Sequence, residues 1–108
     1  MDLIKVLILT LFTTFSSCMS GSIYINGDSS AVNAEVYVDN KLYGLMKKES
    51  YKTSNNEIYY YSSLIIKVTN GPHSLKFKSE NSKYLNIDVT LQGEEYIFID
   101  FQKMSIKR

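Results

Sequence analysis

The chain has 108 residues, which is enough for one small domain and too few for two. Its 12 basic residues nearly balance its 11 acidic ones and are scattered along the chain, so the sequence offers no basic patch for nucleic acid or an anionic membrane surface. The chain has one cysteine and therefore no internal disulfide, so its stability must come from an apolar core.

The first eighteen residues have the pattern of a secretory signal peptide. A short charged start precedes an apolar run at residues 6–15, and two serines lead to the only cysteine, Cys18. The segment Phe15-Ser16-Ser17-Cys18 resembles the lipobox of bacterial lipoproteins. The resemblance implies that residues 1–17 are removed and that Cys18 receives acyl chains such as palmitate. Each buried methylene contributes about 0.8 kcal/mol, so several acyl chains anchor a protein stably to a membrane, whereas a single acyl chain binds only marginally.

Two other interpretations of this segment stay open. A transmembrane helix needs about 20 apolar residues, and Thr10, Thr13 and Thr14 interrupt this run. Ordinary cleavage near Ser20 would leave Cys18 in the discarded piece. The lipoprotein interpretation is preferred because a single thiol in an exported protein has no other evident role.

From residue 22 onward the apolar residues recur with a period of two, which predicts β-strands. The expected strands are, in chain order, 22–26, 34–38, 41–43, 64–68, 74–78, 85–91 and 96–101. After residue 20 the sequence shows no pattern of an amphipathic helix of useful length. Residues 103–108 are expected to form a frayed tail.

Turn residues separate these segments. Asp39 and Asn40 predict a tight turn because both side chains tolerate positive φ, and Gly44 is expected to close the short return strand. Pro72 cannot donate to a strand ladder, so Asn70-Gly71-Pro72 is expected to be a connection. Gln92-Gly93-Glu94 is expected to turn the chain into its last strand.

Short strands with turn signals about every eight to twelve residues predict an all-β fold, here a small antiparallel β-sandwich over residues 22–102. A signal peptide at 1–17 and a lipidated tether at 18–21 would precede it. Eight apolar residues are expected to share one buried layer between two sheets. They are Val36, Val38, Ile66, Val68, Leu75, Phe77, Ile87 and Val89.

The order of strands and turns resembles the PEGA-like domains of bacterial and archaeal envelope proteins. The resemblance is carried by Gly21–Ile25, Ala34–Gly44, Asn70–Leu75, Tyr84 and the final paired strands, which together span nearly all of the chain after the signal. Asn40 stands where the family has a turn glycine, and the Pro-Glu-Gly-Ala signature is missing. The resemblance implies an extracytoplasmic β-sandwich, commonly an accessory or adhesive module, with no catalytic residues to transfer.

Residues 46–63 form an insertion relative to that pattern. Asn55-Asn56 predicts a hairpin turn, and the consecutive Tyr59, Tyr60 and Tyr61 must point to both faces of a strand. Exposed tyrosine beside asparagine and serine is the composition of an adaptable contact surface. The alternative is a plain hairpin that packs its tyrosines on the edge of the sandwich.

The sequence predicts no catalytic site, metal or cofactor. His73 is the only histidine, and zinc there would need carboxylate partners that the spacing does not suggest, so a structural role at the turn is expected. Asp88 and Asp100 alternate with apolar residues on strands, which is typical of a solvated face. A glycine-rich phosphate loop before a helix is also missing from the sequence.

The sequence therefore predicts an extracytoplasmic lipoprotein of the cell envelope, held to the membrane through Cys18, that acts as a non-catalytic binding or structural module. A protein or glycan partner is expected, and nucleic acid is not. The candidate contact residues are Asn55, Asn56, Tyr59, Tyr60 and Tyr61. The alternative function is a small accessory or inhibitor lipoprotein that acts on one specific envelope enzyme or secretion component.

Overall fold

The computed structural model describes residues 19–108, so Cys18 and the predicted signal peptide lie outside the described residues. The described part forms nine β-strands and one short 3-10 segment, and it contains no α-helix. None of its segments is therefore a helix long and apolar enough to cross a membrane. The all-β prediction is confirmed.

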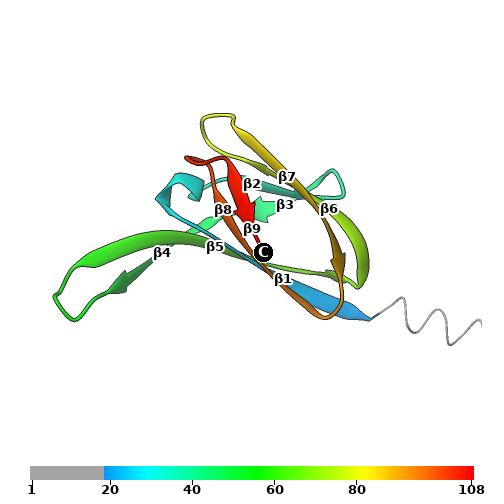
Figure 1. Cartoon of the computed structure of the whole chain (residues 1–108), viewed down its shortest axis with the longest axis horizontal. Helices are drawn as coiled ribbons and strands as arrows, with labels where there is room; N and C mark the ends of the chain where they lie inside the picture. Colours follow the sequence, from blue (N-terminus) through cyan, green and yellow to red (C-terminus); the bar gives the residue numbers. More distant parts are fainter. Residues whose placement is uncertain (1–18) are drawn as a thin grey trace, which may run out of the picture.

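The strands form two sheets that face each other (Figure 1). The five-stranded sheet has the order β4-β5-β1-β8-β9, formed by β4 (Lys47–Lys52), β5 (Ile58–Thr69), β1 (Ser20–Gly27), β8 (Glu94–Asp100) and β9 (Ser105–Lys107). The four-stranded sheet has the order β3-β2-β6-β7, formed by β3 (Lys41–Leu45), β2 (Glu35–Val38), β6 (Gly71–Lys78) and β7 (Tyr84–Leu91). The 3-10 segment η1 (Ser29–Ala31) lies between β1 and β2 in the chain and packs against β5 and β8.

The core lies between the sheets and follows from the period-two pattern. Of the eight predicted core residues, six are buried, and Val68 and Ile87 are partly buried and pack against them. The five-stranded sheet adds further apolar side chains: Ile23, Ile25, Ile97 and Ile99. One buried polar group, the Ser62 hydroxyl, donates to the carbonyl oxygen of Asp28 at 3.0 Å, so its burial leaves no unpaired hydrogen-bonding group.

Two expectations about pairing are wrong. The sandwich is not wholly antiparallel, because β1 pairs with β8 in parallel, from Ser22 opposite Glu94 to Gly27 opposite Ile99. The final strands β7 and β8 do not pair with each other, because the turn at Gly93, with φ of 86°, carries the chain from one sheet to the other. Alternation shows which residues face inward, but it does not show which strand lies alongside.

Several expected boundaries also differ. Gly44 does not close its strand but lies within β3, opposite Val36 and beside a register shift. Pro72 belongs to β6, at a point where β7 is the only neighbouring strand, since β2 pairs with β6 only from Leu75 onward. β1 begins at Ser20, so half of the expected tether 18–21 is part of the sheet.

The expected frayed tail at 103–108 contains β9, which pairs with β8 through Ile106 opposite Ile99. Ile106 packs against the core, and Arg108 pairs with Glu95 of β8. Two apolar residues, Met104 and Ile106, in a six-residue segment are too short a signal for a strand, so the sequence alone did not indicate it.

We expect Phe77→Ala to lower the free energy of unfolding by about 3–5 kcal/mol, because the ring is fully buried and its removal leaves a cavity. Phe98→Ala is the matched control, since Phe98 lies on the opposite side of the five-stranded sheet and is 41% exposed. Urea denaturation measures both variants. Equal midpoints for wild type and Phe77→Ala would show that the inward face is assigned wrongly.

Candidate binding surface

The insertion 46–63 forms the hairpin β4–β5, which projects beyond the four-stranded sheet (Figure 1). The turn is closed by two backbone hydrogen bonds, from the Thr53 N–H to the Glu57 carbonyl at 2.9 Å and from the Asn56 N–H to the Thr53 carbonyl at 3.0 Å. Asn56 has φ of 64°, a conformation that asparagine tolerates. The predicted hairpin is confirmed, and Asn55 and Asn56 lie exposed at its tip.

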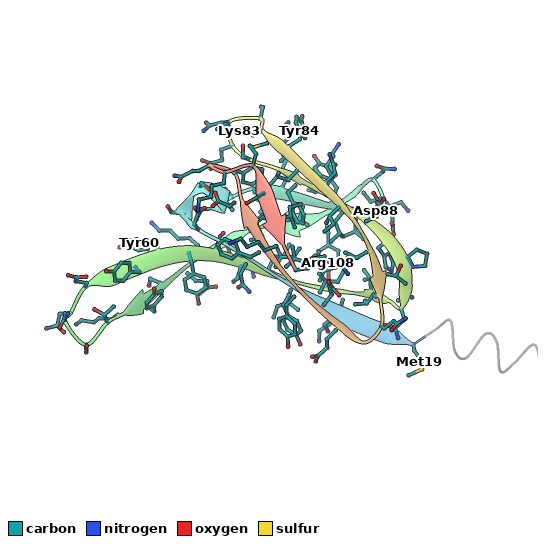
Figure 2. The ribbon with its side chains drawn as sticks, viewed as in Figure 1. Met19, Tyr60, Lys83, Tyr84, Asp88 and Arg108 are labelled. Atoms are coloured by element: carbon teal, nitrogen blue, oxygen red, sulfur yellow. The ribbon has the colours of Figure 1, made fainter. Side chains whose placement is uncertain are left out.

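Strand alternation divides the three consecutive tyrosines between two faces of the hairpin. Tyr59 and Tyr61 point to the side of the five-stranded sheet that faces away from the core, whereas Tyr60 points to the other side. The Nζ atom of Lys48 lies 4.4 Å from the centre of the Tyr60 ring. Tyr60 also lines an open cleft of about 460 Å³, together with Lys83 from the turn after β6 (Figure 2).

The outward side of the five-stranded sheet carries two clusters of aromatic side chains. Tyr51 of β4 stacks on Tyr59 of β5 with ring centres 5.6 Å apart, and the Tyr61 ring lies 6.0 Å from Tyr51. Further along the sheet, Tyr24 of β1 stacks on Tyr96 of β8, with ring centres 4.8 Å apart and planes 13° apart. The parallel β1–β8 pair places these last two residues directly opposite each other.

We call this surface the tyrosine face. Its members are Tyr24, Tyr51, Tyr59, Tyr61, Ile65, Tyr96 and Phe98. Tyr51, Ile65 and Tyr96 are 55%, 52% and 59% exposed, and the described residues do not cover them. Scattered exposed apolar residues are ordinary, but a contiguous set of them marks an interaction site.

Only part of this surface was predictable from the sequence. Tyr59 and Tyr61 were among the candidate contact residues, whereas Tyr24, Tyr51 and Tyr96 were not. A usable signal existed, because Tyr24 alternates with two buried isoleucines, and Tyr96 and Phe98 alternate with two more. Large aromatics at outward positions of two strands indicate an apolar outer face, but the sequence does not show that these strands are neighbours.

The other four tyrosines lie away from the tyrosine face. Tyr37 and Tyr84 flank the Nζ atom of Lys76, at 5.0 and 5.4 Å from their ring centres, on the outer side of the four-stranded sheet. The Tyr43 hydroxyl accepts a hydrogen bond from the Lys67 N–H at 3.0 Å and so joins β3 to β5. Tyr60 faces the cleft.

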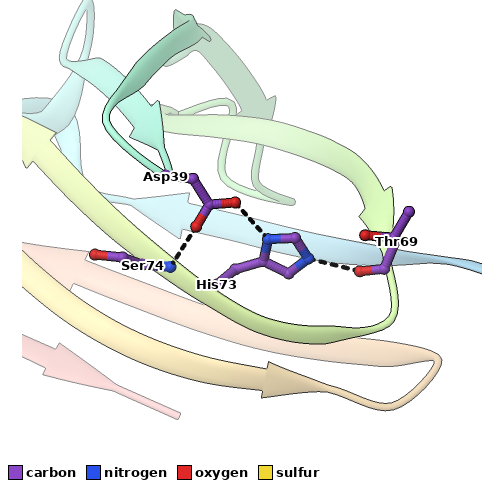
Figure 3. A network of polar contacts seen from close by, with 4 residues as sticks. All are labelled: Asp39, Thr69, His73 and Ser74. Atoms are coloured by element: carbon purple, nitrogen blue, oxygen red, sulfur yellow. Dashed lines mark hydrogen bonds and ion pairs between the residues drawn. The ribbon is translucent and has the colours of Figure 1, made fainter. Parts of the chain in front are cut away.

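His73 joins the β2–β3 turn to the end of β5 (Figure 3). Its Nδ1 lies 2.7 Å from the Asp39 Oδ2, and its Nε2 lies 2.6 Å from the Thr69 carbonyl oxygen. Both partners are hydrogen-bond acceptors, so both ring nitrogens must donate, which requires the charged imidazolium. Asp39 also accepts the Ser74 N–H at 2.9 Å, which holds the Asp39-Asn40 turn against β6.

The pKa values of this pair follow from these contacts. Burial acts to lower the pKa of His73, but the hydrogen bonds to Asp39 and Thr69 and the charge of Asp39 outweigh it, so the pKa is raised above 6.5. The Ser74 N–H and then His73 lower the pKa of Asp39 below 3.8. The pair connects the Asp39-Asn40 turn to β6 and to the end of β5. Residues 19–108 contain no group of three or more His, Cys, Asp or Glu side chains able to hold a metal ion.

The sequence matches no protein-family model and no curated protein. The assignment to the PEGA-like domains therefore stays a prediction from the residues.

The His73–Asp39 pair predicts a pH dependence of stability. A raised histidine pKa stabilises the fold below pH 6.5, and this contribution is lost as pH rises through the raised pKa. A lowered aspartate pKa stabilises the fold above pH 3.8, and this contribution is lost as pH falls through the lowered pKa. We expect wild type to lose stability as pH rises above 6.5 and through the raised histidine pKa, and His73→Gln to lose less, because glutamine stays neutral.

Urea midpoints measured across that range check this expectation. Asp88→Asn serves as the control, since Asp88 is an exposed carboxylate on β7. Identical pH profiles for wild type and His73→Gln would contradict the assigned role of His73.

Proposed function

We propose that this protein is a lipid-anchored, extracytoplasmic module of the cell envelope that binds a partner without catalysis, through the tyrosine face, which continues onto the outward side of the β4–β5 hairpin. The observation that carries the proposal is the pair of exposed clusters of stacked tyrosines on the outer side of the five-stranded sheet. Tyrosine presents a large, rigid contact area at little cost in side-chain entropy and is enriched among binding hot spots.

The position of the proposed lipid anchor favours a contact surface that points away from the membrane. β1 begins at Ser20, and the Met19 carbonyl accepts the Asn70 N–H at 2.8 Å, so lipid at Cys18 would hold this end of the sheet close to the bilayer. The hairpin tip lies at the opposite end of the sheet (Figure 1). The twelve residues of β5, at about 3.3 Å each, separate the two ends by roughly 40 Å. The proposed contact surface therefore extends away from the membrane.

A second candidate function is an accessory or inhibitor lipoprotein that acts on one envelope enzyme or secretion component. The observation in its favour is the exposed hairpin tip at Asn55 and Asn56, which projects beyond the sandwich. In that case the tip, and not the tyrosine face, would carry the binding. Variants of the two regions separate these functions.

We expect Cys18→Ser to release the protein from membranes, and we expect mass spectrometry to find acyl chains on the wild-type N-terminus. Ser17→Ala is the matched control, because it keeps a small residue before the cysteine. Recovery of wild type with an unmodified N-terminus at Ser20 or later would contradict the anchor.

We expect Tyr61→Ala to reduce capture of the partner from solubilised envelope at least tenfold, because Tyr61 belongs to the tyrosine face. Tyr60→Ala is the matched control: it removes the same side chain from the neighbouring position, but on the other face of the hairpin. Both variants should keep the wild-type denaturation midpoint. Loss of capture in Tyr60→Ala alone would place the contact in the cleft.

The double variant Asn55→Ala, Asn56→Gly tests the second candidate. Glycine preserves the positive φ of residue 56 while the tip side chains are removed. We expect full capture by this variant. Loss of a single stoichiometric enzyme from the captured material would instead support the inhibitor function.

A further inference from the structure

The register of the five-stranded sheet produces a groove within the tyrosine face. Ser63 of β5 lies opposite Asn26 of β1, so two small polar side chains stand side by side. Two residues further along each strand, Ile65 and Tyr24 form the next outward pair, and Tyr96 extends that row on β8. On the other side of the small pair stands Tyr61. This small pair leaves a depression two strands wide, with Lys47 of β4 opposite Ser63 at one end and Phe98 of β8 opposite Asn26 at the other.

This groove has a volume of about 270 Å³, and its walls are uncharged. The outward-pointing side chains that line it are Tyr24, Asn26, Tyr61, Ser63, Ile65 and Tyr96. Nucleic acid and acidic glycans need an excess of cationic side chains at the point of contact. The groove lining has no charged residue, and its two charged neighbours on β4, Lys47 opposite Ser63 and Glu49 opposite Tyr61, have opposite signs. The ligand that complements it is neutral.

The polar floor of the groove favours a sugar over a purely apolar peptide segment as its ligand. Asn26 offers two N–H donors and a carbonyl acceptor, and the Ser63 hydroxyl both donates and accepts. An apolar helix seated here would bury these groups without partners, at a cost of about 1–3 kcal/mol for each unpaired group. A pyranose ring has hydroxyls at its rim to pair with them, and it has C–H groups that are attracted to the negative face of an aromatic ring.

We propose that this groove binds a neutral glycan, with one sugar ring seated over Asn26 and Ser63 between Tyr61 and Tyr24. The inference rests on the proposed binding function and specifies its ligand class. The groove is slightly smaller than the roughly 300–1,000 Å³ of a typical small-molecule pocket, so it holds one unit of a longer chain. The chain then continues toward Tyr51 and Tyr59, which extend the same face along the hairpin.

The full-length lipoprotein, purified from membranes, is screened against an array of neutral and acidic oligosaccharides, and affinities for the retained glycans are measured by calorimetry. We expect neutral glycans to bind and acidic ones of equal length not to bind. Ser63→Val fills the floor of the groove while keeping a residue that suits a strand, and we expect it to weaken binding at least tenfold. Ser50→Val is the control, because Ser50 lies opposite Tyr60 on the other face of the hairpin.

Three results would overturn the glycan assignment. They are no retention of any neutral oligosaccharide, equal affinity for acidic ones, and equal loss in Ser63→Val and Ser50→Val. If glycan binding fails while Tyr61-dependent capture from the envelope persists, the binding function stands with a protein partner. Concentration-dependent dimers abolished by Tyr61→Ala would make a second copy of this chain the occupant. If both glycan binding and capture are absent, the proposed function fails as well.

Discussion

The parallel pairing of β1 with β8 is the contact on which the rest of this structure depends. β1 is the central strand of the five-stranded sheet, and β8 returns beside it after the whole four-stranded sheet has been formed. Inward, the pair places Ile23 and Ile25 beside Ile97 and Ile99 at the centre of the core. Outward, it places Tyr24 against Tyr96. One backbone pairing therefore forms both the middle of the core and the middle of the tyrosine face.

The core and the tyrosine face are coupled by the pleat of the strands. A strand that buries its alternate residues must present the others to the opposite side, so the position of each outward tyrosine is set by the burial of its neighbours. A one-residue slip of β1 against β5 would turn Tyr24 inward and Ile23 outward. Where the hairpin projects beyond the four-stranded sheet, no core burial on one side determines which of its residues are exposed. There both sides of β5 are exposed, and Tyr60 and Tyr61 face different surroundings.

Local sequence signals predicted the features that depend on local chemistry. The Asp39-Asn40 turn has positive φ at both residues, the alternation of β6 and β7 points its apolar residues inward, and the hairpin turns near Asn56. Long-range pairing was not predictable, because alternation is the same whichever strand lies alongside. The expectation of an antiparallel sandwich failed at β1–β8 for this reason. The candidate site was correspondingly half predicted: Tyr59 and Tyr61 lie on one continuous insertion, whereas Tyr24 and Tyr96 meet only through that pairing. The predicted anchor at Cys18 lies outside the described residues.

The nine tyrosines provide their own test of the central claim, that partners bind on the tyrosine face. Five of them lie on that face, and Tyr37, Tyr43, Tyr60 and Tyr84 lie elsewhere. The direct measurement is an NMR titration of the protein, with its tyrosine rings isotopically labelled, using soluble glycan fragments released from the cell envelope. The account predicts that the ring signals of Tyr24, Tyr61 and Tyr96 shift most, that those of Tyr51 and Tyr59 follow, and that the other four stay in place. Shifts confined to those four, or spread evenly over all nine, would contradict it.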